Sequence, residues 1–158
     1  MKLAVHDEAA MIAMGEQLAG SCHDPVVFYL YGPLGAGKTT LVRGFMRGLG
    51  YAAAVKSPTY TLIEPYEVGV RHVYHLDLYR VRDAAELDYL GLRDLQDGNA
   101  VLLVEWPERG EGFLPPADVE ITIDYAAEGE GRQLAMQAHG TVGEKLITAF
   151  LGGDFNPG

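Results

Sequence analysis

Hydrophobic and polar residues along the first third of the chain predict a helix, a strand and a second helix. Apolar residues recur at helical spacing over 7–19, behind Asp7 as a suitable N-cap. The continuous β-branched and aromatic run at 26–31 predicts a strand buried on both faces. Helical spacing over 41–49 predicts the next helix, which ends near Gly48. A glycine-rich turn joins this strand to this helix.

The rest of the chain continues the alternation of strands and helices. The pattern predicts, in order, a loop running into a strand over 57–67, a strand over 70–79, a short helix over 83–90, a strand over 100–104, a hairpin of 119–123 with 133–139, and a last helix introduced by a capping-box pattern, Thr141 with Glu144. This order predicts an α/β domain with a mainly parallel central sheet and some antiparallel strands. No repeat or long linker interrupts it, so we expect residues 1–158 to form one domain, with a frayed tail at 152–158.

Composition limits the partners and the location. Acidic residues outnumber basic ones by 22 to 12, and a formal net charge of −10 argues against direct clamping of DNA or RNA phosphates. The single cysteine, Cys22, fits a reducing compartment and is expected to pack as a small buried hydrophobe. The N-terminus lacks the apolar stretch of a signal peptide, and no apolar run approaches the ~20 residues of a membrane span. We therefore expect a cytoplasmic protein without membrane or DNA partners, whose large partners are other proteins.

The glycine-rich turn carries the strongest chemical signal. Gly32, four further residues, and then Gly37, Lys38 and Thr39 form the P-loop pattern between an apolar strand and an amphipathic helix. Glycines let several backbone N–H groups face a phosphate chain, and the helix N-terminus adds its positive dipole. Lys38 supplies a full charge, Thr39 a hydroxyl ligand for Mg²⁺, and Thr40 a donor near the α-phosphate. A chance match in a chain with 20 glycines would lack this setting, so the pattern predicts a P-loop NTPase-like three-layer fold that binds a nucleoside triphosphate with Mg²⁺.

Two carboxylates near the ends of predicted strands are candidates to complete such a site. A P-loop needs an acidic residue that holds Mg²⁺ directly or through water. Glu105 follows the apolar strand, which is the usual setting of this residue, although a strand-end acid can also be merely solvated. Asp77 lies on a polar face of the preceding strand, where a salt bridge to Arg80 or Arg82 is the alternative.

Thr59 and Trp106 are further candidates, each with an ordinary alternative. Thr59 lies between the P-loop helix and the next strand, where many P-loop proteins sense the γ-phosphate. The tripeptide Ser57-Pro58-Thr59 is equally typical of a simple turn. Trp106 follows Glu105 and could cover the site, whereas a lone tryptophan is more often a packing residue.

Four segments together resemble the TsaE family of bacterial ATPases, also called YjeE. They are Gly32-Pro33-Leu34-Gly35-Ala36-Gly37-Lys38-Thr39-Thr40, Lys56-Ser57-Pro58-Thr59-Tyr60-Thr61-Leu62, His75-Leu76-Asp77-Leu78-Tyr79-Arg80 and Val104-Glu105-Trp106-Pro107-Glu108. Their order and spacing match the family over residues 7–151, and three of them are far more specific than a P-loop alone. The resemblance implies an ATPase, weak by itself, that works with the proteins TsaD and TsaB. It would support threonylcarbamoyladenosine formation at adenosine 37 of tRNA while meeting the tRNA only indirectly.

The resemblance also implies roles for individual residues. These roles are phosphate binding by Lys38 and Thr40 with the backbone of Gly35, Ala36 and Gly37, Mg²⁺ ligation by Thr39 and Glu105, and catalysis near the γ-phosphate by Asp77 and Thr59 with Lys38. Trp106 would lie beside the site and the partner surface. Glu8 and Glu108 would line the nucleotide pocket.

Three other classes of P-loop protein are alternatives to this interpretation. A small metabolite kinase usually brings several arginines in a lid, whereas Arg80, Arg82 and Arg109 are scattered here. A regulatory GTPase carries an Asn-Lys-x-Asp motif, and neither Asn99 nor Asn156 is followed by lysine. ATP as the nucleotide rests on this difference and on the resemblance. A nucleotide-gated binding module, in which hydrolysis is incidental, would use the same residues and stays open.

Overall fold

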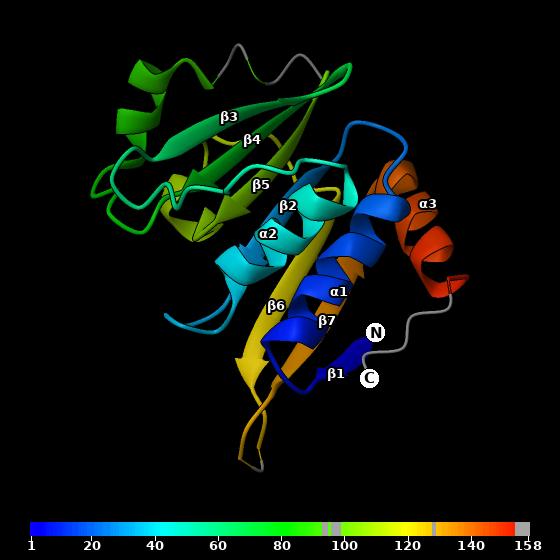
Figure 1. Ribbon diagram of the computed structural model, residues 1–158. Helices are drawn as coiled ribbons and strands as arrows, with labels where there is room; N and C mark the ends of the chain where they lie inside the picture. The colour runs from blue at the N-terminus through cyan, green and yellow to red at the C-terminus, as the bar shows by residue number, and fades with distance from the viewer. Residues whose placement is uncertain (93–94, 96–98, 128, 154–158) are drawn as a thin grey trace.

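The fold is a seven-stranded sheet with its helices packed mainly on one face (Figure 1). The computed structural model describes residues 1–92, 95, 99–127 and 129–153. The described residues form strands β1 (Lys2–Val5), β2 (Val27–Tyr31), β3 (Ile63–Val68), β4 (Arg71–Asp77), β5 (Ala100–Glu105), β6 (Val119–Tyr125) and β7 (Arg132–Ala138), helices α1 (Glu8–Gly20), α2 (Lys38–Gly48) and α3 (Gly140–Leu151), and the 3₁₀ turns η1 (Ala84–Leu90) and η3 (Pro107–Gly110). Along these described residues, no helix is long and apolar enough to cross a membrane.

Strand order places the ends of β2, β4 and β5 next to one another. The order is β1-β7-β6-β2-β5-β4-β3, with the four central strands parallel and β1, β7 and β3 paired antiparallel to their neighbours. This confirms the predicted α/β fold with a parallel centre and antiparallel strands. Leu30 and Asp77 both pair with Glu105, so the turn after β2 begins beside these two carboxylates.

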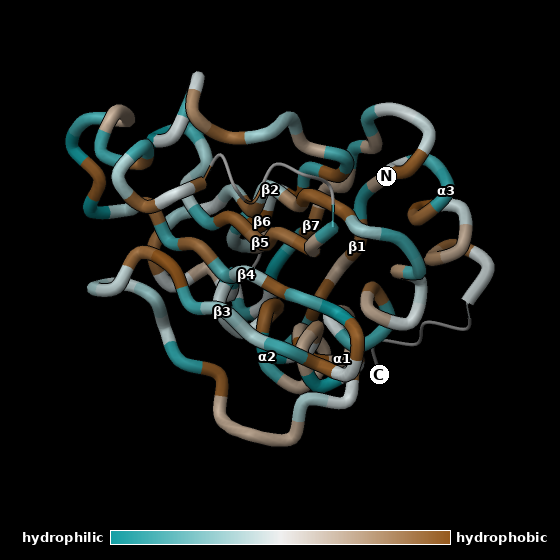
Figure 2. Tube along the Cα trace, turned by 90° about the horizontal axis from the view of Figure 1, so that it is seen from above, coloured by the Kyte–Doolittle hydropathy of each residue, from teal (hydrophilic) through white to brown (hydrophobic). Residues whose placement is uncertain are grey.

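Helices α1 and α2 pack closely against one face of the sheet (Figure 2). The rings of Phe28 and Phe45 meet edge to face with centroids 5.4 Å apart, which ties α2 to β2. A Cβ atom on Gly44 would lie only 2.2 Å from the carbonyl oxygen of Ile12. The two helices therefore approach at a contact that only glycine permits, and the start of α1 is held beside α2.

The opposite face has a thinner cover, made in the described residues by η1 and neighbouring loops around Leu87 and Phe113. Every residue of β5 is buried, as expected for a central parallel strand. In β2, however, Tyr29 and Tyr31 are only partly buried. The prediction that this strand is buried on both faces was therefore wrong for one face, because η1 and the neighbouring loops cover that face only thinly.

Most predicted elements are confirmed, and their caps show why. The Asp7 side chain accepts a hydrogen bond from the Ala10 N–H at 2.8 Å, and so begins α1. The helix expected over 83–90 forms as the 3₁₀ turn η1, capped by Asp83. The hairpin forms as β6 and β7.

Cys22 is 1% exposed, which confirms that it packs as a buried residue, and this burial raises the pKa of its thiol to about 11.

Three details at the chain ends differ from or extend the expectations. Strand β1 was not predicted; it pairs along β7. The predicted capping box was wrong, because α3 begins at Gly140 and Thr141 already lies within it. The N-cap is His139, whose N–H donates to the Asp118 carbonyl, so the junction with β6 determines where the helix starts. Gly152 ends α3; the rest of the expected frayed tail, 154–158, lies outside the described residues.

Candidate functional site

The P-loop connects β2 directly to α2. Gly37, the N-cap of α2, has a φ of 113°, a left-handed conformation that favours glycine. No side chain caps this helix, so its first-turn N–H groups have no capping side-chain acceptor. A helix N-terminus in this state is suited to bind an anion.

Lys38 lies folded back over the loop. Its Nζ atom donates to the carbonyl of Gly32 and, at 3.3 Å, to that of Pro33. The side chain is 5% exposed, and this burial lowers the pKa of the ammonium group, an effect partly offset by Glu105 and Asp77. Lys38 is thus a buried cation held by neutral carbonyls, which a phosphate oxygen could replace with a stronger, charge-assisted bond.

Glu105, at the end of β5, contacts both Thr39 and His75. Its two carboxylate oxygens lie 3.2 and 3.1 Å from the hydroxyl of Thr39. Oxygen ligands at about 2.1 Å from one octahedral Mg²⁺ ion are themselves about 3 Å apart, so this pair fits the ion. His75 approaches the same carboxylate from β4, with its Nε2 atom 2.5 Å from Oε2.

Asp77 and Thr59 meet at the same edge of the sheet. The Thr59 hydroxyl lies 3.5 Å from Asp77 Oδ2 and 2.7 Å from the Ser57 hydroxyl, while the Tyr79 N–H donates to Oδ1. Burial raises the pKa of the Asp77 carboxyl; the Tyr79 hydrogen bond opposes this and the charge of Glu105 adds to it. A buried carboxylate with a raised pKa is a good candidate proton acceptor.

Trp106 lies at this edge among aromatic rings and cationic side chains. Its ring lies 4.1 Å from Lys38 Nζ and 5.0 Å from the ring of Tyr79. The Arg109 guanidinium lies on the outer side, 5.5 Å from the Tyr79 ring. The backbone of Trp106 has a φ of 58°, an unusual conformation for a large residue and one often found at functional sites. Arg80, considered as a partner of Asp77, lies over the ring of Tyr60 instead.

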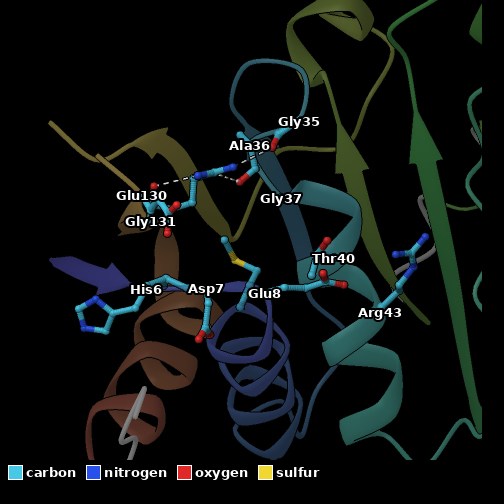
Figure 3. Close-up of a pocket in the computed structure, with 13 residues that line it drawn as sticks. His6, Asp7, Glu8, Gly35, Ala36, Gly37, Thr40, Arg43, Glu130 and Gly131 are labelled. Atoms are coloured by element: carbon cyan, nitrogen blue, oxygen red, sulfur yellow. Dashed lines mark hydrogen bonds between the residues drawn. The ribbon is translucent and has the colours of Figure 1, made fainter. Parts of the chain in front are cut away.

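Two cavities flank the P-loop. The smaller, about 240 Å³, brings together the sequence-predicted residues Gly35, Ala36, Gly37, Lys38, Thr39, Thr40, Thr59, Asp77, Glu105 and Trp106. The larger, about 530 Å³, shares Gly35 to Gly37 and Thr40 with it and extends to the start of α1. Figure 3 shows Glu8 pointing toward Thr40 across this larger cavity. Together the two cavities offer room for a phosphate chain on one side of the loop and a nucleoside on the other.

The two predicted glutamates, Glu8 and Glu108, lie in different settings. Glu8 lines the larger cavity, whereas Glu108 is exposed on η3 and lines neither of the two. The sequence marked the polar face of β4 but gave His75 no role, because the pairing of β4 with β5 could not be read. No local pattern signalled that Tyr125 and Arg132 hydrogen-bond to the P-loop carbonyls.

The fold and this site define a P-loop protein of the α/β class. The family described as Threonylcarbamoyl adenosine biosynthesis protein TsaE matches residues 5–134. The chain therefore belongs to the TsaE family.

Individual relatives agree with this membership. A Haemophilus influenzae protein called tRNA threonylcarbamoyladenosine biosynthesis protein TsaE is 40% identical over 151 residues, covering 92% of this chain and 94% of the relative. A Bacillus subtilis protein of the same name is 43% identical over 120 residues, covering 76% and 74%. The crystal structure of Bacillus subtilis YdiB superposes with a TM-score of 0.82 at 32% identity, covering 96% of this chain and 94% of that one.

Proposed function

We propose that this chain is a Mg²⁺-dependent ATPase that supports threonylcarbamoyladenosine formation at adenosine 37 of tRNA, acting with TsaD and TsaB. The observation that carries the proposal is one cavity shared by Lys38, Thr39, Asp77 and Glu105. Membership in the TsaE family supplies the pathway. The acidic net charge of −10 favours contact with partner proteins over direct binding of tRNA.

Phosphate binding follows from the loop and from Lys38. Loop N–H groups and the start of α2 donate hydrogen bonds to the phosphate chain, and Lys38 turns from the carbonyls of Gly32 and Pro33 to the β- and γ-phosphates. Thr40, which lines both cavities, bonds near the α-phosphate. The nucleoside then occupies the larger cavity, bounded by Glu8 and the first turn of α1.

The remaining polar residues act at the γ-phosphate. Thr39 and Glu105 hold Mg²⁺, which when bound neutralises negative charge on the phosphates during hydrolysis. Asp77 orients the attacking water and accepts its proton, a role that its raised pKa suits. Thr59 donates its hydroxyl proton to Oδ2 of Asp77 and so holds this carboxylate in place beside the γ-phosphate.

We assign contact with the partner proteins to the loop at 57–61. Thr59 anchors it to the site through Asp77, while the next residue, Tyr60, is 82% exposed. A loop that joins a γ-phosphate contact to an exposed aromatic residue can change its outer surface when the phosphate leaves. ATP therefore orders the loop, and hydrolysis releases it and alters affinity for the TsaD–TsaB complex.

A complementation experiment tests this function. In bacteria depleted of their own TsaE-family protein, the wild-type chain restores threonylcarbamoyladenosine in tRNA, measured by mass spectrometry of nucleosides, and Lys38→Ala does not. Lys145→Ala, which removes only an exposed ion pair with Asp24, is the matched control and restores it fully. Full restoration by Lys38→Ala would refute a role for ATP in the function.

A further inference from the structure

The β6–β7 hairpin hydrogen-bonds to the back of the P-loop. The hydroxyl of Tyr125 donates to the Leu34 carbonyl at 2.9 Å. The Arg132 guanidinium donates to the Ala36 carbonyl at 3.0 Å and to the Gly35 carbonyl at 3.3 Å (dashed lines, Figure 3). Three consecutive loop carbonyls are thus held by two side chains from the end of one hairpin.

Holding a carbonyl also orients the next N–H group. In a trans peptide the C=O and the following N–H point in opposite directions within one plane. The bond to Leu34 therefore directs the N–H of Gly35 away from the hairpin, and the bond to Ala36 does the same for Gly37. In the described residues, neither of these N–H groups donates to a backbone carbonyl, whereas that of Ala36 donates to Pro33. The N–H groups of Gly35 and Gly37 are thus free donors in two of the three peptide planes that the hairpin holds.

The two hairpin side chains also support each other. The Arg132 guanidinium lies 4.3 Å from the centroid of the Tyr125 ring, within range of a cation–π contact. A hydrogen bond accepted by a peptide carbonyl polarises the N–H of the same peptide and makes that N–H a stronger donor. A cationic donor such as Arg132 has the largest effect of this kind. Arg132 lines the larger cavity, but Tyr125 lines neither cavity and so reaches a ligand only through the loop.

We infer that Tyr125 and Arg132 are positioning residues that hold the P-loop in its phosphate-binding conformation. The inference rests on the proposed function, because it assigns to these residues the orientation of N–H donors toward a phosphate chain. Tyr125 acts on the phosphates only through the loop, and Arg132, although it lines the larger cavity, acts through its guanidinium bonds to the loop carbonyls.

Conservative variants separate this role from direct contact. Tyr125→Phe keeps the ring and removes the donor; Arg132→Lys keeps the charge and removes the forked donor. Each is expected to weaken binding of ATP about threefold, and the double variant about tenfold, as for loss of single hydrogen bonds. Tyr29→Phe is the matched control, since it removes another phenol-to-carbonyl bond, to Pro115, outside both cavities.

The test compares ATP with inorganic tripolyphosphate, which has no nucleoside, by calorimetry without Mg²⁺. Positioning of the loop requires both affinities to fall by the same factor in Tyr125→Phe and Arg132→Lys and to stay unchanged in Tyr29→Phe. A loss confined to ATP, or wild-type affinities in both hairpin variants, would overturn the inference.

A second readout needs no ligand. In nucleotide-free protein, the ¹⁵N–¹H NMR signals of Gly35 and Gly37 are expected to shift or broaden in the hairpin variants and not in Tyr29→Phe. Unchanged signals would overturn the inference. Wild-type protein that bound neither ATP nor tripolyphosphate would contradict the proposed function instead, while these spectra would still decide the role of the hairpin.

Discussion

The Nε2 atom of His75 and the Oε2 atom of Glu105 lie 2.5 Å apart, with both side chains buried. The other ring nitrogen of His75, Nδ1, is buried and has no hydrogen-bond partner among the described residues. A buried N–H group without an acceptor is costly, so the favoured tautomer carries its proton on Nε2 and donates it to the carboxylate. His75 thereby fixes the orientation of the carboxylate that faces Thr39.

Two amide substitutions of His75 test this contact. The side-chain nitrogen of glutamine reaches the position of Nε2, whereas that of asparagine reaches only the position of Nδ1. In the ADP complex, His75→Asn is expected to weaken Mn²⁺ binding, measured by electron paramagnetic resonance, by about tenfold. His75→Gln should stay close to wild type. Equal affinities in the two variants would show that the histidine does not orient Glu105.

Asp77→Asn should separate catalysis from binding. The amide keeps the shape and the acceptor for the Tyr79 N–H but cannot take a proton. We expect turnover to fall by about 10²–10⁴-fold while the affinity for ATP, measured by calorimetry, changes little. A large loss of ATP affinity with preserved turnover per bound ATP would assign Asp77 to binding instead.

The same substitution should stabilise the nucleotide-free fold at neutral pH. Burial raises the pKa of Asp77 above its unfolded value, so the folded state binds more protons than the unfolded state between the two values. Its contribution to stability is present below the unfolded pKa and lost as pH rises through the folded pKa. Asp77→Asn should therefore raise the melting temperature at pH 7, and the gain should vanish near pH ~4. Asp24→Asn, at a half-exposed ion pair, should give no such gain.

Lys38 and Trp106 provide an optical signal for binding. Lys38 Nζ lies 4.1 Å from the ring of the chain's one tryptophan and must leave it to reach the phosphates. ATP should therefore change the tryptophan fluorescence of the wild type. Lys38→Ala should remove this change and lower ATP affinity by about 100-fold or more, with the circular dichroism spectrum unaltered. Retained ATP affinity in that variant would refute the phosphate assignment.

The loop at 57–61 offers a matched pair of threonines. Thr59 hydrogen-bonds to Asp77 in the site, while Thr61 hydrogen-bonds to Glu64 on the surface. We expect Thr59→Ala to reduce the stimulation of ATP hydrolysis by TsaD and TsaB at least tenfold and Thr61→Ala to leave it within twofold, since only the former ties the loop to the γ-phosphate region. Unchanged stimulation in Thr59→Ala would refute the proposed switch.

Features determined by neighbouring residues could be predicted from the sequence. The Asp7 cap, the P-loop between strand and helix, and the apolar strand before Glu105 each have a pattern that spans a few residues. The capping box at Thr141 was wrong because a distant contact, from His139 to Asp118, determines where α3 starts.

Features determined by strand order could not be predicted. The contact between His75 and Glu105 depends on β4 lying beside β5, and the order of the strands has no local signal. The bonds from Arg132 to the P-loop join residues 96 and 97 positions apart. Resemblance to the TsaE family supplied the roles of Thr59 and Asp77, which their spacing alone left open.

The most direct test of the central claim is Mg²⁺-dependent ATP hydrolysis by the purified chain, with and without TsaD and TsaB. We expect weak turnover by the chain alone and a strong rise only when both partners are present. Vigorous turnover by the chain alone, or transfer of phosphate to a small acceptor, would contradict a partner-driven ATPase and favour a P-loop kinase.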